Sequence, residues 1–319
     1  MRALTIHIAS TTPPHSRKGN RVTAERWAHL LRELGHRVRI ENQYRGGDCD
    51  LLVALHARRS LPSIERFEAV FPDRPFVLAL TGTDLYRDLD TDAAARRVLE
   101  RAARLVLLQP MGLRELPRRL RARARVILQS AEPPRRRPRP REDAFEICVL
   151  GHLREVKDPF RTAEAVRRLP PQSRVRVLHA GAALSPEMEG RARREEELNP
   201  RYRWLGELPR GRALQLLARC RLLVLTSLSE GGANAISEAL ACGVPVISSR
   251  ISGSIGLLGT RYPGYFEVGD TEALARLLHR AEVDPRFLAR LGESCRLLAA
   301  KFEPRREKEA WARLLRELA

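Results

Sequence analysis

Short apolar runs alternate with longer amphipathic segments along most of the chain. In the first half, six runs have the length of buried strands, near 4–9, 37–40, 51–55, 76–80, 105–108 and 126–128. Segments with helical periodicity fit between them, most clearly at 22–34 and 93–103. Strands that alternate with helices are typical of parallel α/β sheets, and this is the architecture that we expect.

A second series of the same kind fills the rest of the chain. Its strands are expected near 145–151, 175–179, 202–205, 222–225, 244–248 and 265–268. Closing helices are expected at 272–282, 285–300 and 304–318. Between the two series, EPPRRRPRPRED has no periodicity, and its prolines and like charges indicate an exposed linker.

The pattern therefore predicts two Rossmann-like parallel-sheet domains of similar size facing a cleft. The expected boundaries are 1–132, a linker at 133–143, and 144–302, with a C-terminal helix at 303–319 packing back on the first domain. Ligands of such folds bind at the carboxyl ends of the strands, so the loops that follow strands hold the candidate site residues.

Composition narrows the class of protein. A chain of 319 residues with 43% hydrophobic residues can bury large cores, and no apolar run approaches the ~20 residues of a membrane span. The N-terminus lacks the pattern of a signal peptide. The five cysteines have no metal-ligand spacing and suggest buried residues in a reducing cytoplasm. Asp48 and Asp50 form a DxD triplet, which we interpret as a turn before a strand rather than a metal site.

The net charge of +19 has two possible meanings. Only four of the 58 basic residues are lysines, so the excess of arginine suggests genome composition as much as function. A basic protein can attract nucleic acid, anionic membranes or phosphorylated substrates. Aromatic residues make up only 5% of the chain, which is poor for stacking bases, so we expect no nucleic-acid partner.

The stretch SEGGANAISEALACGVPVISS combines a glycine loop with a helix start. Gly231 and Gly232 permit a tight turn and a close approach of backbone to ligand. The following helix N-terminus offers unpaired N–H groups to an anion or to hydroxyls. Glu230 precedes this helix, while Glu238 lies inside it on the face of Asn234. The two carboxylates can thus face different parts of one extended ligand.

Basic residues follow strands in both halves. In VLGHLREVKDP, the cations after the strand are placed for a diphosphate: His152, Arg154 and Lys157. In the first half, loops after three strands supply candidates for a second, anionic ligand: Arg17, Lys18, Gly19, Asn20, His56, Arg58, Arg59, Thr83 and Asp84. An ordinary set of solvated loop charges is the alternative for each group.

These motifs resemble the GT-B glycosyltransferases of the retaining, glycogen-synthase-like superfamily. SEGGANAISEAL is similar to the family's E-x7-E donor motif, and GHLREVKD to its GRLxxxKG loop. Two positions depart from the pattern, because His152 replaces an arginine and Gly256 a glutamate. The resemblance implies donor-binding residues at His152, Arg154, Lys157, Glu230, Gly231, Gly232, Ala233, Asn234 and Glu238.

By the same resemblance, Glu238 would hold the ribose and Glu230 a hexose hydroxyl. Lys157 and Arg154 would neutralise the leaving diphosphate, and Glu230 completes the implied catalytic set. Residues 1–132 would be the acceptor domain and 144–302 the donor domain. No cofactor or metal is implied.

A narrower resemblance covers both halves, through SRKGNRVTAERW, LLVALHARRS, LALTGTDLYRD and EGGANAISEAL. These are similar to selenosugar synthases of selenoneine biosynthesis, which are cytoplasmic enzymes. The resemblance implies transfer from a UDP-sugar, typically UDP-N-acetylglucosamine, to selenium of selenophosphate. The alternative is a GT-B transferase with an ordinary oxygen acceptor, lipid-linked or at a membrane surface, docked by a basic amphipathic helix at 113–127. That segment lacks interfacial aromatics, so we expect no stable membrane association.

Overall fold

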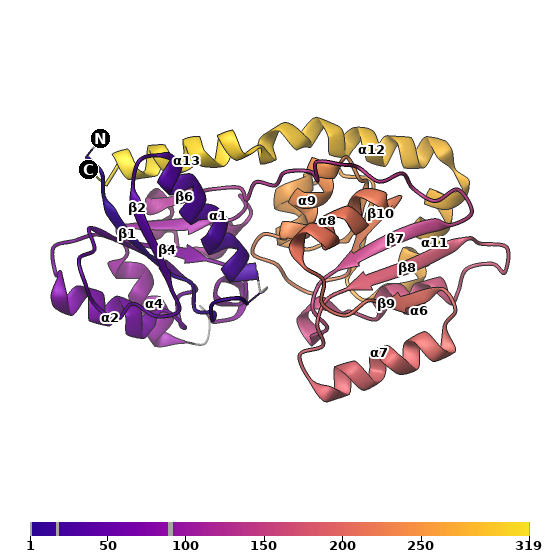
Figure 1. Ribbon diagram of the computed structural model, residues 1–319, viewed down its shortest axis with the longest axis horizontal. Helices are drawn as coiled ribbons and strands as arrows, with labels where there is room; N and C mark the ends of the chain where they lie inside the picture. Colours follow the sequence, from indigo (N-terminus) through magenta and orange to yellow (C-terminus); the bar gives the residue numbers. More distant parts are fainter. Residues whose placement is uncertain (1, 17–18, 89–91, 319) are drawn as a thin grey trace. The chain divides into compact units, whose positions relative to one another are not determined.

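The computed structural model describes residues 2–16, 19–88 and 92–318 (Figure 1). The chain divides into two compact units. The first consists of Met1–Ser130, Glu230–Gly232 and Pro304–Ala319, and the second of Ala131–Ser229 and Ala233–Glu303. Both units are discontinuous in sequence, and each contains one six-stranded sheet.

The sheet of the first unit is parallel throughout, with the order β2-β1-β3-β4-β5-β6. Its strands are β1 (Thr5–Ala9), β2 (Arg37–Glu41), β3 (Leu51–Leu55), β4 (Phe76–Leu80), β5 (Arg104–Leu107) and β6 (Ala124–Val126). The helices are α1 (Gly19–Glu33), α2 (Leu61–Val70), α4 (Ala93–Arg101), α5 (Gly112–Glu115) and α13 (Pro304–Arg316), with shorter turns at η1 (Asp84–Asp88) and η2 (Arg118–Arg123). The order reverses between β1 and β3.

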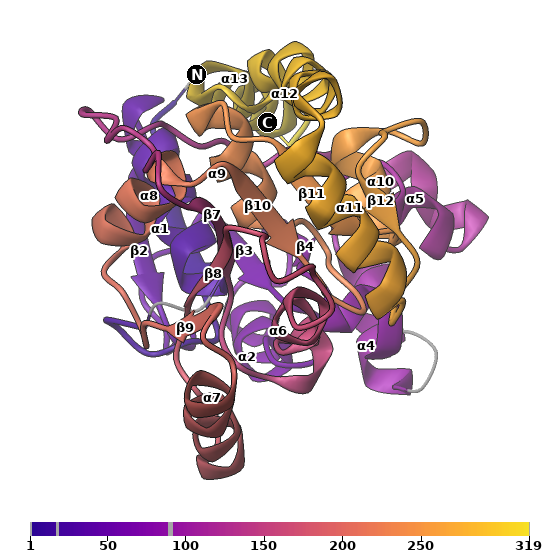
Figure 2. The ribbon, with the colours of Figure 1, turned by 90° about the vertical axis from the view of Figure 1, so that its right-hand side faces the viewer.

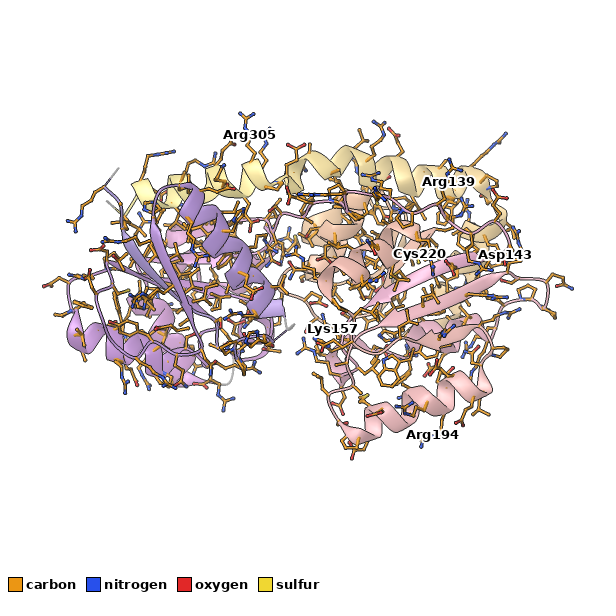
Figure 3. All side chains as sticks on the ribbon, in the orientation of Figure 1. Arg139, Asp143, Lys157, Arg194, Cys220 and Arg305 are labelled. Atoms are coloured by element: carbon orange, nitrogen blue, oxygen red, sulfur yellow. The ribbon has the colours of Figure 1, made fainter. Side chains whose placement is uncertain are left out.

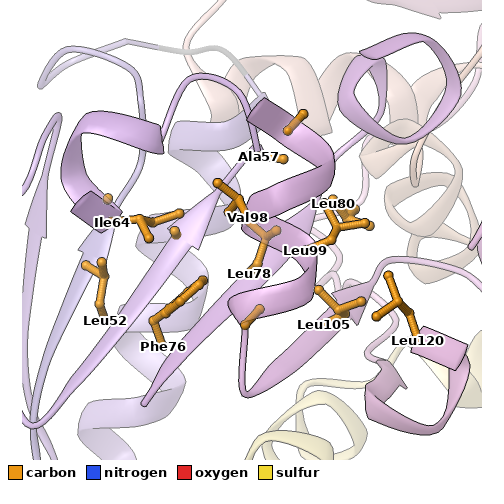
Figure 4. Close-up of a cluster of buried hydrophobic side chains, with 14 of the residues drawn as sticks. Leu52, Ala57, Ile64, Phe76, Leu78, Leu80, Val98, Leu99, Leu105 and Leu120 are labelled. Carbon is orange, nitrogen blue, oxygen red and sulfur yellow. The ribbon is translucent and has the colours of Figure 1, made fainter. Parts of the chain in front are cut away.

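Both faces of this sheet are buried, which explains why its central strands are apolar at every position. On one face, Leu52 and Leu78 pack with residues of α2 and α4, including Ile64 and Val98 (Figure 4). On the other face, alternate strand residues such as Val53 pack with α1 and α13. The alternation follows from the two-residue period of a strand.

The C-terminal helix α13 belongs to the core of the first unit. The rings of Trp27 on α1 and Trp311 on α13 meet edge to face, with centroids 4.8 Å apart. The carboxylate of Glu307 is buried, and it accepts a hydrogen bond from Trp27 Nε1 at 2.7 Å and one from Ser130 N at 2.8 Å. Its Oε2 also lies 3.0 Å from Arg26 Nε. The chain end is therefore fastened to α1 by packing and by a buried ion pair.

The second unit has the sheet order β12-β11-β10-β7-β8-β9, again parallel. Its strands are β7 (Phe145–Leu150), β8 (Val175–Ala180), β9 (Tyr202–Trp204), β10 (Leu222–Leu225), β11 (Val246–Ser249) and β12 (Tyr265–Phe266). Its helices are α6 (Arg161–Val166), α7 (Pro186–Leu198), α8 (Arg210–Arg219), α9 (Asn234–Cys242), α10 (Ser252–Leu258), α11 (Thr271–Val283) and α12 (Pro285–Ala299), with turns η3 (Glu155–Lys157) and η4 (Ala300–Phe302). Helices flank the sheet on both faces (Figure 2).

The predicted α/β class with two parallel sheets is confirmed, and every expected strand is present near its expected position. The single amphipathic helix that the membrane-surface alternative requires at 113–127 does not form. Pro117 interrupts the segment, because the residue before a proline avoids helical angles, and Leu116 is extended with ψ 140°. The segment instead forms α5, η2 and β6. Within the described residues, no helix is long and apolar enough to cross a membrane.

Candidate functional site

In each sheet the strand order reverses once, and the loops at that point are the natural ligand site of an open α/β sheet. In the second unit the reversal lies between β7 and β10. The loop after β7 is the one that carries the predicted diphosphate residues, and the predicted Glu238 follows β10 on α9. The donor-site candidates of the second unit therefore gather at one edge of its sheet.

The range Gly151–Asp158 forms the loop after β7. His152 Nδ1 accepts a hydrogen bond from Ala182 N at 3.1 Å, so this ring nitrogen is used by the protein backbone. Arg154 is exposed, and its guanidinium has no partner among the residues that the structure describes. Of the two, Arg154 is the side chain placed to meet an anion.

Lys157 ends the 3-10 turn η3 within this loop (Figure 3). A Cβ added to Gly151 would lie 4.0 Å from Lys157 Cδ, so the lysine stem passes over that glycine. The lysine is half-buried. The loop thus folds back on itself and brings Lys157 to the carboxyl end of β7.

The start of this loop is held by a buried hydrogen-bond network of side chains from β8 and β9. His179 Nε2 lies 3.0 Å from the carbonyl oxygen of Gly151, and Nδ1 lies 3.0 Å from Tyr202 Oη. Because a carbonyl can only accept, Nε2 carries the proton and Nδ1 accepts from Tyr202. Burial lowers the pKa of His179 to about 4, which keeps the ring neutral. Trp204 Nε1 donates to Gly181 O at 2.8 Å, and a Cβ on Gly181 would overlap the Gly151 carbonyl.

The loop is also held from β10. Thr226 Oγ lies 2.9 Å from the carbonyl oxygens of both Lys157 and Asp158, so its single proton is shared between them. Asp158 has a left-handed backbone, with φ 42°. Arg161 binds the Asp158 carboxylate at 2.7 Å and Thr271 Oγ at 2.7 Å. Thr226 after β10 and Arg161 on α6 therefore fix the end of the loop, and Thr271 holds Arg161 in place.

Helix α9 begins after the glycine motif, as expected. Its N-cap residue, Ala233, provides no side-chain cap, so the first N–H groups of the helix are not satisfied in that way. Glu238 is mostly buried, with 15% of its side chain exposed, and its Oε1 lies 3.8 Å from Nε of Arg210, the first residue of α8. This basic neighbour of the predicted ribose carboxylate was not expected from the sequence.

The segment Glu230–Gly232 groups with the first unit. A Cβ on Gly231 would overlap the carbonyl of Thr81, in the loop after β4. A glycine is therefore required there by backbone packing. The two predicted glutamates fall in different units, and their joint contact with one ligand stays a prediction.

In the first unit the strand order reverses between β1 and β3, and the described acceptor candidates follow β1, β3 and β4. Gly19 and Asn20 begin α1, and Asn20 Nδ2 donates to Thr11 Oγ at 3.4 Å. Arg17 and Lys18 lie outside the described residues. Their contact with an anion stays a prediction.

His56 follows β3 with a positive φ of 80° and is buried. Its Nε2 lies 3.1 Å from Thr83 Oγ, which follows β4. Arg58 is exposed and its Nε lies 3.2 Å from Asp92 Oδ2. A left-handed conformation is costly for a residue with a side chain, and such strain often marks functional loops. The two predicted residues His56 and Thr83 are brought into direct contact.

Asp84 holds together two loops of the predicted acceptor site. Its carboxylate is buried and accepts hydrogen bonds from the backbone N–H groups of Ala57, Thr81 and Gly82, at 3.2, 2.9 and 2.8 Å. These contacts tie the loops after β3 and β4 together. Asp84 thus holds the backbone around Thr83, and its direct contact with an acceptor stays a prediction.

A groove of about 670 Å³ lies elsewhere in the second unit, at the amino ends of β8 and β9. Two of its arginines make structural contacts within the second unit. Arg201 donates to the carbonyl groups of Val166, the last residue of α6, and of Leu169 at 3.0 and 3.1 Å, and Arg167 is paired with Glu195 at 2.8 Å. This groove is at the opposite end of the strands from the donor candidates.

The DxD triplet forms part of a turn before β3, as expected. Asp50 Oδ2 accepts from Thr5 N at 2.8 Å, and Asp48 pairs with Arg74 at 3.1 Å. All five cysteines are buried and free. Across the described ranges, no three histidine, cysteine or acidic side chains form a group that could hold a metal ion.

Three residues around the donor candidates were not singled out from the sequence: His179, Arg210 and Thr226. Each acts through a contact with a residue far away along the chain. Thr226 and Lys157, for example, are 69 positions apart. The one available hint was a polar residue at the end of an apolar strand, in LLVLTS and RVRVLHAG.

Solved structures of other proteins share the fold of this chain. HepE from Anabaena, solved in complex with UDP and glucose, matches 98% of this chain and 100% of its own with a TM-score of 0.77 and 18% identity. Sucrose-phosphate synthase from Thermosynechococcus elongatus matches 99% of both chains with a TM-score of 0.80 and 17% identity. A glycosyltransferase from Rickettsia africae matches 100% of this chain and 99% of its own, at 0.77 and 14%. The predicted GT-B fold is confirmed.

Sequence comparison identifies the family. The model of the family "Glycosyl transferases group 1" matches residues 131–297, which is just over half of the chain and nearly all of the second unit. The matched range includes the loop after β7, α8 and α9, where the donor candidates lie. The protein is thus an enzyme that transfers sugars, and the chain belongs to the glycosyl transferases group 1.

Proposed function

We propose that this glycosyltransferase takes its sugar from a UDP-sugar, with UDP-N-acetylglucosamine as the favoured donor, and binds the diphosphate at the loop Gly151–Asp158. The observation that carries the proposal is the position of Lys157 and Arg154 at the strand reversal of the second sheet. The solved complexes of the structurally similar HepE with UDP and with UDP-glucose support a uridine nucleotide. Glu238 binds the ribose in this proposal.

The acceptor in this proposal is the selenium of selenophosphate, which makes the protein a selenosugar synthase. Support comes from the resemblance of both halves of the chain to those enzymes and from basic residues that follow strands of the first sheet in the sequence. His56 and Arg58 follow β3, and Arg17 and Lys18 precede α1. Charge-assisted hydrogen bonds from such groups offset the repulsion between a small anion and a diphosphate.

The chemistry needs little from a general base, since selenophosphate is already an anionic, polarisable nucleophile. Selenium attacks the anomeric carbon, a C–Se bond forms, and the bond from that carbon to the diphosphate oxygen breaks. UDP leaves with the electron pair, stabilised by Lys157 and Arg154. Water then hydrolyses the Se–P bond and releases phosphate. Electrostatic stabilisation of the leaving group is the main catalytic contribution, and no metal takes part.

The test is a reaction of the purified protein with UDP-N-acetylglucosamine in EDTA, with and without enzymatically generated selenophosphate. We expect UDP release that depends on selenophosphate, and a hexosamine product with the selenium isotope pattern. UDP binding without such turnover would contradict the acceptor and leave an oxygen acceptor as the alternative. Loss of activity in EDTA would contradict metal independence. Absence of UDP binding would contradict the donor site as well.

A further inference from the structure

The loop after β10 touches the loop after β7 at the strand reversal of the second sheet, and one hydroxyl makes the central contact. Thr226 is buried, and its Oγ lies 2.9 Å from the carbonyl oxygens of Lys157 and Asp158. Two residues further on, Leu228 N donates to Val156 O at 2.9 Å. The main chain around Lys157 is thus fixed by consecutive contacts from the end of β10.

The geometry at Asp158 shows why this contact matters. A left-handed backbone at Asp158, with φ 42° and ψ 57°, ends the turn η3. This conformation costs free energy in a residue with a side chain. The hydroxyl of Thr226 binds the main-chain carbonyls of Lys157 and Asp158. Arg161 binds the Asp158 carboxylate. These contacts offset the cost and keep the turn closed.

The direction of the Lys157 side chain follows from this turn. Its stem passes over Gly151, at the start of the same loop. The carbonyl of Gly151 is in turn fixed from below by His179. Both ends of the loop are therefore held by buried side chains from other strands, and the lysine is directed before any ligand binds.

We propose that Thr226 is a positioning residue for the transfer reaction: its hydroxyl holds the main chain at Lys157 so that the ammonium group faces the diphosphate of the donor. This inference rests on the donor site proposed above. Since a preorganised cation loses less entropy when it binds an anion, Thr226 contributes to affinity for the diphosphate through Lys157 without touching it.

The test compares Thr226→Val, which removes the hydroxyl at nearly constant shape, with Thr226→Ser, which keeps it. Binding of UDP and of uridine is measured by calorimetry, with uridine as a competitor of UDP. We expect Thr226→Val to weaken UDP by about tenfold, as for the loss of one charge-assisted contact. Uridine, which lacks the diphosphate, binds all three proteins alike, and Thr226→Ser restores UDP affinity toward that of the wild type.

A double-mutant cycle with Lys157→Ala separates positioning from a general structural effect. If Thr226 acts through Lys157, adding Thr226→Val to Lys157→Ala weakens UDP no further. Additive effects, or equal losses for UDP and uridine, would overturn the positioning role. If Lys157→Ala binds UDP as the wild type does, the proposed donor site is wrong. If only Thr226→Val leaves UDP affinity unchanged, the donor site stands and the positioning role of Thr226 is wrong. Melting temperatures of all variants monitor folding.

Discussion

His179 gives the second unit a pH-dependent stability. Burial lowers its pKa from 6.5 to about 4, so below pH 6.5 the unfolded chain binds a proton that the folded protein excludes. The free energy of unfolding that the neutral, buried His179 ring contributes is fully present above pH 6.5, and it is lost as the pH falls from 6.5 toward 4. Between pH 7 and pH 5 the wild type should lose about 2 kcal/mol through this group. Urea unfolding of the wild type and of His179→Gln at both pH values measures the difference, and equal losses would contradict it.

Glu238 is predicted to bind the ribose, and its removal should act on the nucleotide itself. Glu238→Ala is expected to weaken UDP by at least about tenfold, because it deletes hydrogen bonds to a carboxylate. Glu230→Ala, at the predicted hexose contact, should spare UDP affinity and lower turnover. Glu293→Ala, an exposed surface carboxylate on α12, is the control. Calorimetry with UDP distinguishes the three, and unchanged affinity in Glu238→Ala would contradict the ribose assignment.

The end of β8 supports the loop Gly151–Asp158 through a close backbone contact. A Cβ on Gly181 would overlap the carbonyl of Gly151, whereas one on Gly211 in α8 would meet nothing within 4 Å. Gly181→Ala should therefore displace the loop, destabilise the second unit by about 1–3 kcal/mol, and weaken UDP binding. Gly211→Ala should do neither. Urea unfolding with UDP calorimetry checks both variants, and a Gly181→Ala protein that binds UDP normally would show that the loop tolerates displacement.

The loop between β1 and α1 carries the basic pair predicted for the acceptor. Arg17→Ala with Lys18→Ala should raise the KM for selenophosphate and leave the affinity for UDP unchanged, since the two substrates occupy different sites in the proposal. A variant with the same loss of charge, Arg135→Ala with Arg136→Ala, lies in the linker and should change neither. Initial rates at varied selenophosphate measure the constant. A KM equal to that of the wild type would move the acceptor site elsewhere.

Elements defined by local periodicity could be predicted, and those decided by distant contacts could not. The central strands β3, β4 and β10 are visible as apolar runs because they are buried at every position. The segment 113–127 has a helical pattern, yet Pro117 divides it. The loop Gly151–Asp158 could be singled out from its cations after β7, and its contact with a diphosphate stays a prediction. The supports of this loop, His179 and Thr226, could not be singled out, since ordinary polar residues at strand ends acquire their role only when the sheet forms.

The two units depend differently on the ends of the chain. The strands of the second unit all lie between residues 145 and 266, whereas the first unit is completed by residues 304–319 from the end of the chain. Helix α13 covers α1, and its Trp311 fills the core against Trp27 (Figure 1). The first unit therefore reaches its final packing only when the last residues are present, which makes the contacts of α13 decisive for its stability.

Glu307 supplies the polar contacts between α13 and the rest of the first unit. Its loss should lower the stability of the first unit alone. Glu307→Ala leaves Arg26, Trp27 Nε1 and Ser130 N without their buried acceptor, at a cost of about 3–5 kcal/mol. In a Trp204→Phe background the remaining tryptophans, at 27 and 311, both report on this unit.

Urea unfolding followed by the fluorescence of Trp27 and Trp311 should show a lower midpoint for Glu307→Ala. A control, Glu303→Ala at an exposed position, should leave the midpoint unchanged. Glu307→Gln keeps the shape and one acceptor oxygen, so it should fall between the two. Coinciding midpoints for all variants would mean that packing of Trp311 alone holds α13. A lower midpoint only in Glu307→Ala and Glu307→Gln would instead show that the buried carboxylate fastens the chain end to the first sheet.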